Sequence, residues 1–248
     1  MISRDHPRYH SLIQREMITE AWRRGILADS GMIAHGRGEA FDYLLGERTT
    51  EPAARAIRAA AAALLLAENP VISVNGNTAA LVPGAVVELA DAIGGKIEIN
   101  LFHRTEKRVR LIEELLLENG AREVLGTDEL LYIDDIKSPR ATASPDGIYS
   151  ADVVLVPLED GDRTEILRES GKTVITIDLN PLSRTSRKAS ISITDNIVRA
   201  IPALIEAVRE LEDLSRDELE LILEEFDNPE NIRETLKLID LRRYNPEL

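Results

Sequence analysis

From residue 70 onward, short apolar segments alternate with helical segments of about ten to fifteen residues. ADVVLVPL (151–158) is apolar almost throughout, as expected for a parallel strand that is covered on both faces. The alternation implies βαβ units and predicts an α/β fold built on an open, mostly parallel sheet with flanking helices. The segments expected to be strands are 71–74, 96–102, 122–126, 151–158, 173–179 and 190–195.

Helical patterns fill most of the remaining chain. The segments expected to be helical are 11–24, 51–68, 78–94, 106–120, a short stretch after Asp162, and 196–211. Thr49-Thr50 and Pro52 are typical of the first turn of the second helix, and Gly120 of a helix end in the left-handed conformation. Residues 127–150, with the run SPRATASPDG, predict a long loop or lid.

We therefore expect three parts: a helical N-terminal segment with a Gly-Arg-Gly loop (1–69), a core (70–213) and an acidic helical tail (214–248). Twelve acidic residues against three arginines lie between Glu206 and Glu234. Such a run is typical of a solvated amphipathic surface, and a docking site for a basic partner is the alternative.

The charge balance excludes two classes of partner. With 44 acidic and 30 basic residues the formal net charge is −14, which disfavours nonspecific binding to nucleic acid or to an anionic membrane. A small anionic substrate is compatible with this charge, because arginines can gather in one cleft. The absence of cysteine removes disulfides, thiolate catalysis and cysteine zinc sites. No segment resembles a signal peptide or approaches the ~20 apolar residues of a membrane helix, so we expect a cytoplasmic protein.

Polar side chains follow almost every expected strand. Because open parallel sheets bind ligands beyond the carboxyl ends of their strands, these residues are candidates for a binding site. Plain turn chemistry explains any one of them equally well, but the repetition favours a site. The segments are Asn75-Gly76-Asn77, Asn100 with His103-Arg104, 159–164, 178–184 and Asp195-Asn196.

Two apparent nucleotide signatures do not hold. Gly171-Lys172-Thr173 lacks the earlier glycine of a P-loop and precedes its strand instead of following it, so it predicts a turn. Gly36-Arg37-Gly38 begins like a dinucleotide fingerprint, but Phe41 stands at the third glycine position.

The segment 31–49 is the most unusual in the chain. Glycines on both sides of Arg37 would let the backbone approach a ligand while the guanidinium binds phosphate oxygens, although an exposed mobile turn would explain them equally well. Arg15 on the first helix has the same ambiguity. The four histidines show no metal-ligand spacing and no G-x-S-x-G elbow occurs, so catalytic and metal-binding residues stay unassigned. Chemistry would then rest on positioning and electrostatic stabilisation.

Five collinear blocks between about residue 5 and residue 228 carry a family resemblance. They are AHGRGEAFDYLLGERTTEPA, VISVNGNTAALVP, EINLFHRTE, ADVVLVPLEDGDRTE and VITIDLNPLSRTSRKASISITDNIVRA. The chain resembles the archaeal-type phosphopantothenate synthetases, or 4-phosphopantoate–β-alanine ligases. The resemblance implies a Rossmann-like homodimer of coenzyme A biosynthesis. It would join (R)-4-phosphopantoate to β-alanine with ATP and Mg²⁺, releasing AMP and diphosphate through an acyl-adenylate.

The resemblance also implies a set of ATP-binding positions, two groups of which follow expected strands while a third opens a helix. These positions are Arg15, Arg37, Asp178, Leu179, Asn180, Arg184, Thr185, Asn196 and Ile197. Strand-end position alone suggests a second set for the phosphopantoate and β-alanine. This set is Asn75, Asn77, Arg104, Asp160 and Arg163.

Two other classes of function compete with a ligase. A nicotinamide-dependent oxidoreductase would share the fold, but its glycine fingerprint is missing. A noncatalytic acidic interaction protein would explain the tail, but not the polar residues at so many strand ends.

Overall fold

The computed structural model describes residues 2–6, 8–128, 130–133 and 142–244, with side chains as far as residue 239. Its centre is one open five-stranded sheet in which every neighbouring pair is parallel, which confirms the predicted fold class. The strands are β1 (Pro70–Val74), β2 (Lys96–Ile99), β5 (Val153–Pro157), β6 (Thr173–Ile177) and β7 (Ile191–Ile193). Their order across the sheet is β2-β1-β5-β6-β7.

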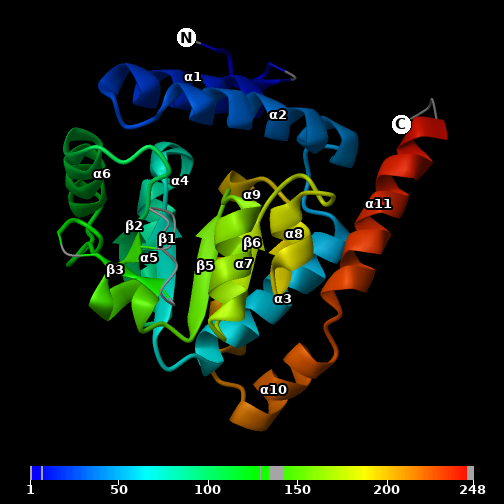
Figure 1. Cartoon of the computed structure of the whole chain (residues 1–248). Coiled ribbons are helices and arrows are strands. Elements are labelled where there is room, and N and C mark those ends of the chain that lie inside the picture. Colours follow the sequence, from blue (N-terminus) through cyan, green and yellow to red (C-terminus); the bar gives the residue numbers. More distant parts are fainter. Residues whose placement is uncertain (1, 7, 129, 134–141, 245–248) are drawn as a thin grey trace.

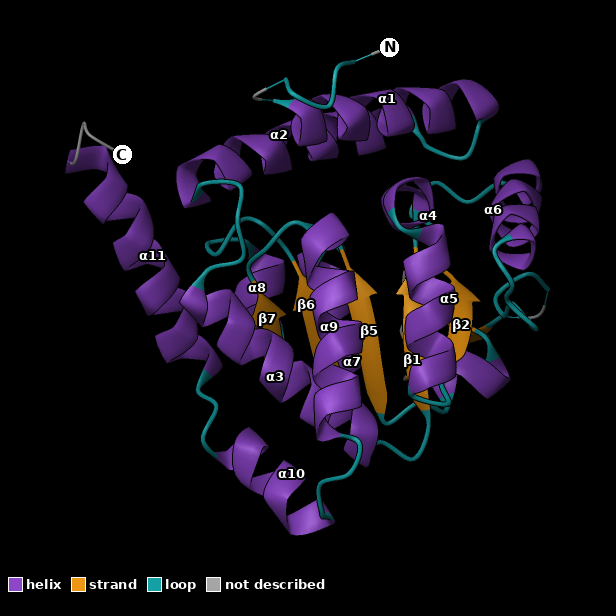
Figure 2. Cartoon of the chain, turned by 180° about the vertical axis from the view of Figure 1, so that it is seen from behind, coloured by secondary structure: helices purple, strands orange, loops and turns teal. Residues whose placement is uncertain are grey.

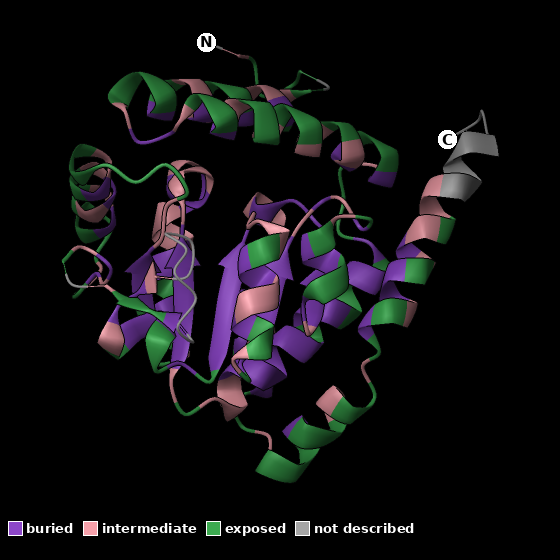
Figure 3. Ribbon diagram, in the orientation of Figure 1, coloured by how far each residue is buried: buried purple, intermediate pink, exposed green. Residues whose placement is uncertain are grey.

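Helices cover both faces of this sheet. One face carries α3 (Glu51–Leu66), α5 (Pro83–Ala92) and α9 (Ile197–Leu211), and the other carries α7 (Gly161–Glu169) and α8 (Arg184–Lys188) (Figures 1 and 2). Every residue of β1 and β5 is therefore buried, and all of them except Ser73 in β1 are apolar (Figure 3). The core is aliphatic, with alanine-rich α3 packed closely against α9.

A helical hairpin lies across the carboxyl ends of the strands (Figure 1). It consists of α1 (Tyr9–Arg24) and α2 (Asp29–Leu45), while α4 (Gly76–Leu81) and α6 (Glu106–Glu118) lie at the β1–β2 end of the sheet. The chain continues through α10 (Arg216–Glu224) and α11 (Asn228–Tyr244), which pack on α3, so the tail is helical as expected. The division of the chain at residues 69 and 213 stays a prediction.

The prediction of a Gly-Arg-Gly loop is wrong. Residues 36–38 lie inside α2 with helical backbone, and neither glycine has a positive φ. A Cβ at Gly36 would meet nothing within 4 Å, and one at Gly38 would make an ordinary contact at 3.5 Å with Cδ1 of Leu179. The glycines of α2 lower helix propensity, but packing on the sheet edge overrides this.

Two further expectations differ from the structure. The helix expected over 78–94 is two helices, because Pro83 has no N–H to continue α4 and instead occupies the first turn of α5. The strand expected at 122–126 is only a bridge between Leu125 and Glu98, since Gly126 turns the chain away with φ 79°.

The loop expected over 127–150 contains regular structure within its described part. A two-stranded antiparallel pair joins β3 (Leu131–Tyr132) to β4 (Thr142–Ala143), followed by a short π-helical turn, Pro145–Tyr149. Ile148 and Ala143 are fully buried against the sheet. The rest of that expectation, at 129 and 134–141, lies outside the described residues.

The predictions made from cap and turn residues are confirmed. The Thr50 hydroxyl accepts from the N–H of Ala53 at 3.4 Å and Pro52 occupies the first turn of α3. Gly120 and Gly171 both have positive φ, at 99° and 84°, so Gly171-Lys172-Thr173 is a turn before β6.

Candidate active site

Two adjoining cavities lie between α2 and the carboxyl edge of the sheet. The smaller, of about 120 Å³, is called the inner pocket, and the larger, of about 580 Å³, is called the outer groove. Both lie where chain connections leave β1 and β5 in opposite directions, because β2 and β6 flank these two strands. Such a switch point is where open α/β sheets bind their ligands.

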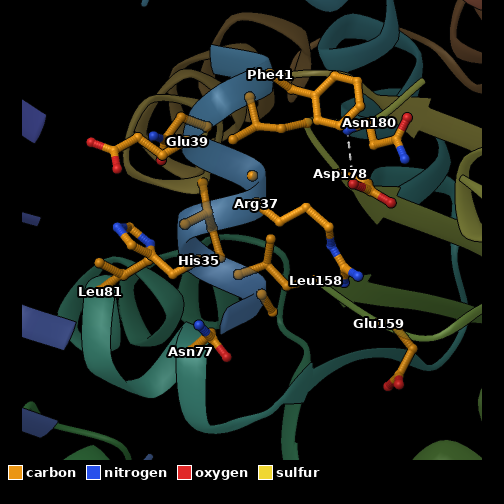
Figure 4. A pocket seen from close by; sticks show the side chains of 15 residues that line it. His35, Arg37, Glu39, Phe41, Asn77, Leu81, Leu158, Glu159, Asp178 and Asn180 are labelled. Atoms are coloured by element: carbon orange, nitrogen blue, oxygen red, sulfur yellow. Dashed lines mark hydrogen bonds between the residues drawn. The ribbon is translucent and has the colours of Figure 1, made fainter. Parts of the chain in front are cut away.

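The inner pocket combines an apolar lining with a few polar groups. Its apolar side chains come from α2, α4, the turns after β5 and β6, and the start of α9: Phe41, Leu81, Leu158, Leu179 and Ile197. Arg37 extends from α2 between Leu158 and Asp178 (Figure 4). Arg37 also lines the outer groove, so its guanidinium stands where the two cavities join.

The turn after β6 is rigidly built. The Asp178 carboxylate accepts the N–H of Asn180 at 2.9 Å and the hydroxyl of Ser183 at 2.5 Å. Burial raises the pKa of Asp178, while these two hydrogen bonds and nearby Arg37 oppose the rise. The Ser183 hydroxyl also caps α8, so these hydrogen bonds hold a turn whose residues line both cavities.

A buried polar network fixes the helical hairpin over the site. The Asn196 amide donates to Oε1 of Gln14 at 2.9 Å and to Oδ2 of Asp42 at 2.8 Å. Arg199 donates to Oδ1 of Asp42 and to Oδ1 of Asp195, both at 2.6 Å. The side chain of Asn196 is thereby occupied in holding α1 and α2 to the start of α9, and its Oδ1 caps Val198.

Arg15 lies outside both cavities. Its guanidinium donates twice to the Glu39 carboxylate, with Nη2 to Oε2 at 2.9 Å. That bond raises the pKa of Arg15. Burial alone would raise the pKa of Glu39, but hydrogen bonds from Arg15 and Tyr43 hold it below its usual value. His35, one turn earlier on α2, has its pKa lowered by burial, so it is neutral at neutral pH.

Several predicted residues line the outer groove while also maintaining the fold. Asn75 caps α4 by accepting from the N–H of Thr78 at 3.0 Å and donates to the carbonyl of Pro157 at 2.9 Å. Asn77 donates to the carbonyl of Gly31 at 2.9 Å, which fastens α2 to α4. Asp160 caps α7 through the N–H of Asp162 at 2.8 Å.

The turn into α8 contributes a hydroxyl and a charged side chain to the same groove. The Thr185 hydroxyl donates to the carbonyl of Glu159 at 2.8 Å. Arg184 forms ion pairs with Asp162 and Glu165, which leave about half of its side chain exposed.

Arg104 and Arg163 line neither cavity. Arg104 donates to the carbonyl of Gly126 at 2.7 Å. Arg163 is buried, at 3% exposure, and donates to Oδ1 of Asn100 at 2.5 Å. Asn100 in turn donates to the carbonyl of Thr142 at 3.0 Å. Asn100 lines the outer groove, so Arg163 contacts a lining residue without lining the groove itself.

Glu98 is a buried carboxylate that holds the 142–149 segment to β2. It accepts the N–H of Ser144 at 3.1 Å and that of Ile148 at 2.6 Å. Burial raises its pKa, against the effect of those bonds. Gly147 has no room for a side chain here, because a Cβ would lie 2.1 Å from Oε2 of Glu98.

Sequence reasoning missed several side chains that line the cavities, three of which are polar or aromatic groups of interest for binding. They are His35 and Phe41 on α2, and Arg108 in the first turn of α6. Helical phase is the signal that would place His35 and Phe41 on one side of a helix, but the glycines of 31–49 predict a loop. Arg104 stands nearer the strand end than Arg108, so strand-end position favours Arg104.

The site combines an apolar pocket with arginines at its mouth. This arrangement suits a ligand with one planar apolar part and a chain of phosphates. Among residues 2–6, 8–128, 130–133 and 142–244, no group of three or more His, Asp or Glu side chains is placed to hold a metal ion. In the same part of the chain, no helix is long and apolar enough to cross a membrane.

Comparison with known proteins identifies similar chains. A family profile described as phosphopantothenate/pantothenate synthetase matches residues 52–242. A 4-phosphopantoate–beta-alanine ligase of Thermococcus onnurineus (strain NA1) is 58% identical over 236 residues, which cover 95% of this chain and 90% of the relative. A protein of the same name from Methanosarcina mazei is 55% identical over 238 residues, covering 96% and 94%. Another, from Methanospirillum hungatei JF-1, is 49% identical over 245 residues, 99% of both chains.

Proposed function

The chain belongs to the phosphopantothenate/pantothenate synthetase family, and on this premise we propose that it is the ligase that joins 4-phosphopantoate to β-alanine in coenzyme A biosynthesis. The product is 4′-phosphopantothenate, formed through a new amide bond. The observation that carries this proposal is identity of 55–58% with ligases of that name over nearly the whole chain. Neither a nicotinamide oxidoreductase nor a noncatalytic interaction protein gains support from these relatives.

We propose that ATP drives the reaction in two steps. A carboxylate oxygen of phosphopantoate attacks the α-phosphorus, and the bond to the bridging oxygen breaks to release diphosphate. The neutral amine of β-alanine then attacks the acyl carbon, loses a proton, and expels AMP. Because no nucleophile of the protein is needed, catalysis rests on positioning and on stabilising negative charge.

The inner pocket is proposed to hold the adenosine, and Arg37 the triphosphate. Phe41, Leu179 and Ile197 supply apolar surface for the base. From the junction, Arg37 can reach phosphates that extend toward Arg184 and Thr185 in the outer groove. Asn196 serves this site by fixing the hairpin that carries Arg37.

Mg²⁺ fits this site as an ion that arrives with ATP. Glu159 lines both cavities and Asp160 lines the outer groove, and Mg²⁺ commonly takes one or two carboxylates together with substrate phosphates. When bound, the ion neutralises the triphosphate and stabilises the departing diphosphate. Glu159 and Asp160 are the ligands we propose.

The outer groove is proposed to hold phosphopantoate and β-alanine beside Asn75, Asn77 and Asp160. Arg104 and Arg163 act there indirectly, through the backbone of 126–127 and through Asn100. We retain a cytoplasmic location as part of the proposal.

A homodimer is also part of the proposal, and it bears on Arg15. Trp22, Ile33, Tyr43 and Leu44 are exposed on α1 and α2, and a second copy could cover them. Since Arg15 lies on the same hairpin outside its own cavities, an ATP contact by Arg15 would be made to the second copy. Light scattering at micromolar concentration tests the dimer, and a monomer of 27.5 kDa would contradict it.

Nucleotide analysis after incubation tests the function. The protein with ATP, Mg²⁺, 4-phosphopantoate and β-alanine should form AMP and 4′-phosphopantothenate in equal amounts, and omission of either acid or amine should stop product formation. Formation of ADP and phosphate would refute the adenylate step. No nucleotide-dependent amide formation at all would refute the proposed ligase.

A further inference from the structure

Arg108 is a cation of the outer groove that the fold does not neutralise. It lies in the first turn of α6, where its backbone N–H donates to the capping hydroxyl of Thr105 at 3.2 Å. Its side chain donates through Nη1 to the carbonyl of His103, while its Nε is buried and makes no hydrogen bond to any described residue. No carboxylate of a described residue lies within ion-pair distance of it. Arg108 therefore lines the groove as a guanidinium with no carboxylate partner among the described residues.

The other arginines near the groove are differently occupied. Arg184 is paired with two carboxylates, and Arg104 is turned to backbone carbonyls outside the cavity. Arg37 resembles Arg108 in having no ion-pair partner among the described residues, but it stands at the junction with the inner pocket. Arg37 and Arg108 are thus two separate cationic positions along the cavities.

The sheet order places these two arginines toward opposite ends of the site. The inner pocket is lined from the ends of β5 and β6 and the start of α9, whereas Arg108 enters the groove beside the end of β2, the opposite edge strand. In 4-phosphopantoate the carboxylate and the phosphate are at opposite ends of the molecule. If the carboxylate meets the α-phosphate of ATP near Arg37, the phosphate is directed toward β2 and α6.

We propose that Arg108 binds the phosphate of 4-phosphopantoate and so determines the preference of the enzyme for the phosphorylated acid. This inference rests on the proposed function and specifies which residue recognises the phosphate of the substrate. Unphosphorylated pantoate would leave this guanidinium without an anionic partner, which would disfavour that acid. The planar guanidinium also matches the geometry of a phosphate.

The test compares Arg108→Gln and Arg108→Lys with a control, Arg110→Gln. Arg110 lies on the same helix, has a side chain 74% exposed, and pairs only with Glu106, at 3.8 Å. Calorimetric titration of 4-phosphopantoate into each protein measures affinity without turnover. Steady-state assays then give KM and kcat with 4-phosphopantoate, with unphosphorylated pantoate and with ATP.

We expect Arg108→Gln to weaken 4-phosphopantoate binding about tenfold to a hundredfold, with Arg108→Lys recovering part of the loss. The affinity for ATP should stay within about twofold of wild type, and the preference for 4-phosphopantoate over unphosphorylated pantoate should shrink, because the unpaired guanidinium no longer penalises pantoate. Every value for Arg110→Gln should stay within about twofold of wild type. Unchanged 4-phosphopantoate affinity in Arg108→Gln would overturn the inference, and so would a loss confined to ATP.

Failure of the inference and failure of the proposed function are distinguishable. If the wild-type protein forms no AMP, the ligase proposal fails, but the titration still reports whether Arg108 binds the phosphate. If the wild-type protein is active and the variant binds 4-phosphopantoate normally, only the role of Arg108 fails.

Discussion

Replacing Arg37 with alanine tests the binding of the triphosphate at the junction of the two cavities. Arg37 lies on α2, lines both cavities, and has no ion-pair partner among the described residues. No hydrogen bond or ion pair to a described residue is lost with its side chain, and alanine suits a helix at least as well as arginine. The free energy of unfolding should therefore change by less than about 0.5 kcal/mol.

The loss of ATP affinity follows from the bonds that the guanidinium makes to phosphate. Hydrogen bonds to charged groups contribute about 1.5–3 kcal/mol, and about 1.4 kcal/mol corresponds to tenfold in affinity. Because Arg37 is exposed in the free protein, solvent weakens the gain and the lower part of this range applies. We expect the Kd for ATP, measured by titration calorimetry, to rise about tenfold in Arg37→Ala and less in Arg37→Lys.

Arg23→Ala is the matched control for this experiment. Arg23 lies on α1, has a side chain 66% exposed, and pairs with Glu20 at 3.8 Å without lining either cavity. Its Kd for ATP should equal that of wild type. An unchanged Kd in Arg37→Ala would refute the assignment of the triphosphate to this junction.

Three further variants test how the site is held. Gly36→Ala should raise the free energy of unfolding by about 0.5–1 kcal/mol, because residue 36 is helical and a Cβ there meets nothing within 4 Å; a lower melting temperature would contradict the helical placement. Asp42→Asn should lower the free energy of unfolding by about 1–3 kcal/mol in denaturant titrations, because the buried carboxylate accepts from both Asn196 and Arg199. A variant as stable as wild type would show that this network does not hold the hairpin. Burial raises the pKa of Glu98 above its ordinary 4.5, so its contribution is complete below pH 4.5 and declines as the pH rises through the raised pKa. The stability of wild type relative to Glu98→Gln should fall over that range, and a difference independent of pH would contradict it.

The sheet could be predicted from the sequence because burial on both faces leaves a clear pattern. VVLVP in β5 is apolar throughout, and PVISV in β1 is apolar apart from Ser73, since helices cover both sides. The segment around Leu125 has a similar composition but forms a single bridge, because Gly126 turns the chain after one pairing. The positive φ of Gly126 thus ends the pairing that the apolar composition of 122–126 predicts.

The error at α2 has a tertiary cause. Three glycines in DSGMIAHGRGEAF argue locally against a helix. In the fold, Gly31 allows Asn77 to approach, since a Cβ would lie 2.8 Å from its Oδ1, and Gly38 passes over Leu179. Gly31 and Gly38 thus lie where other segments contact the helix, while Gly36 faces open space, and no local signal distinguishes such a helix from a loop.

The candidate site could be located but its side chains could not be assigned. The strand-end rule found Asn75, Asp160 and Asp178, which all line the outer groove. It could not tell which arginine enters the groove, because that depends on helix phase and on neighbouring carbonyls. Arg104 precedes α6 and turns away, whereas Arg108, within its first turn, faces the groove.

Transfer of an oxygen isotope tests the central claim most directly. With 4-phosphopantoate labelled with ¹⁸O in its carboxylate, the adenylate mechanism leaves one carboxylate oxygen on the α-phosphate when the amine expels AMP. Mass spectrometry of the nucleotide after a single turnover should therefore find one ¹⁸O in AMP and none in diphosphate. Recovery of the label in inorganic phosphate, or AMP without ¹⁸O, would contradict the account.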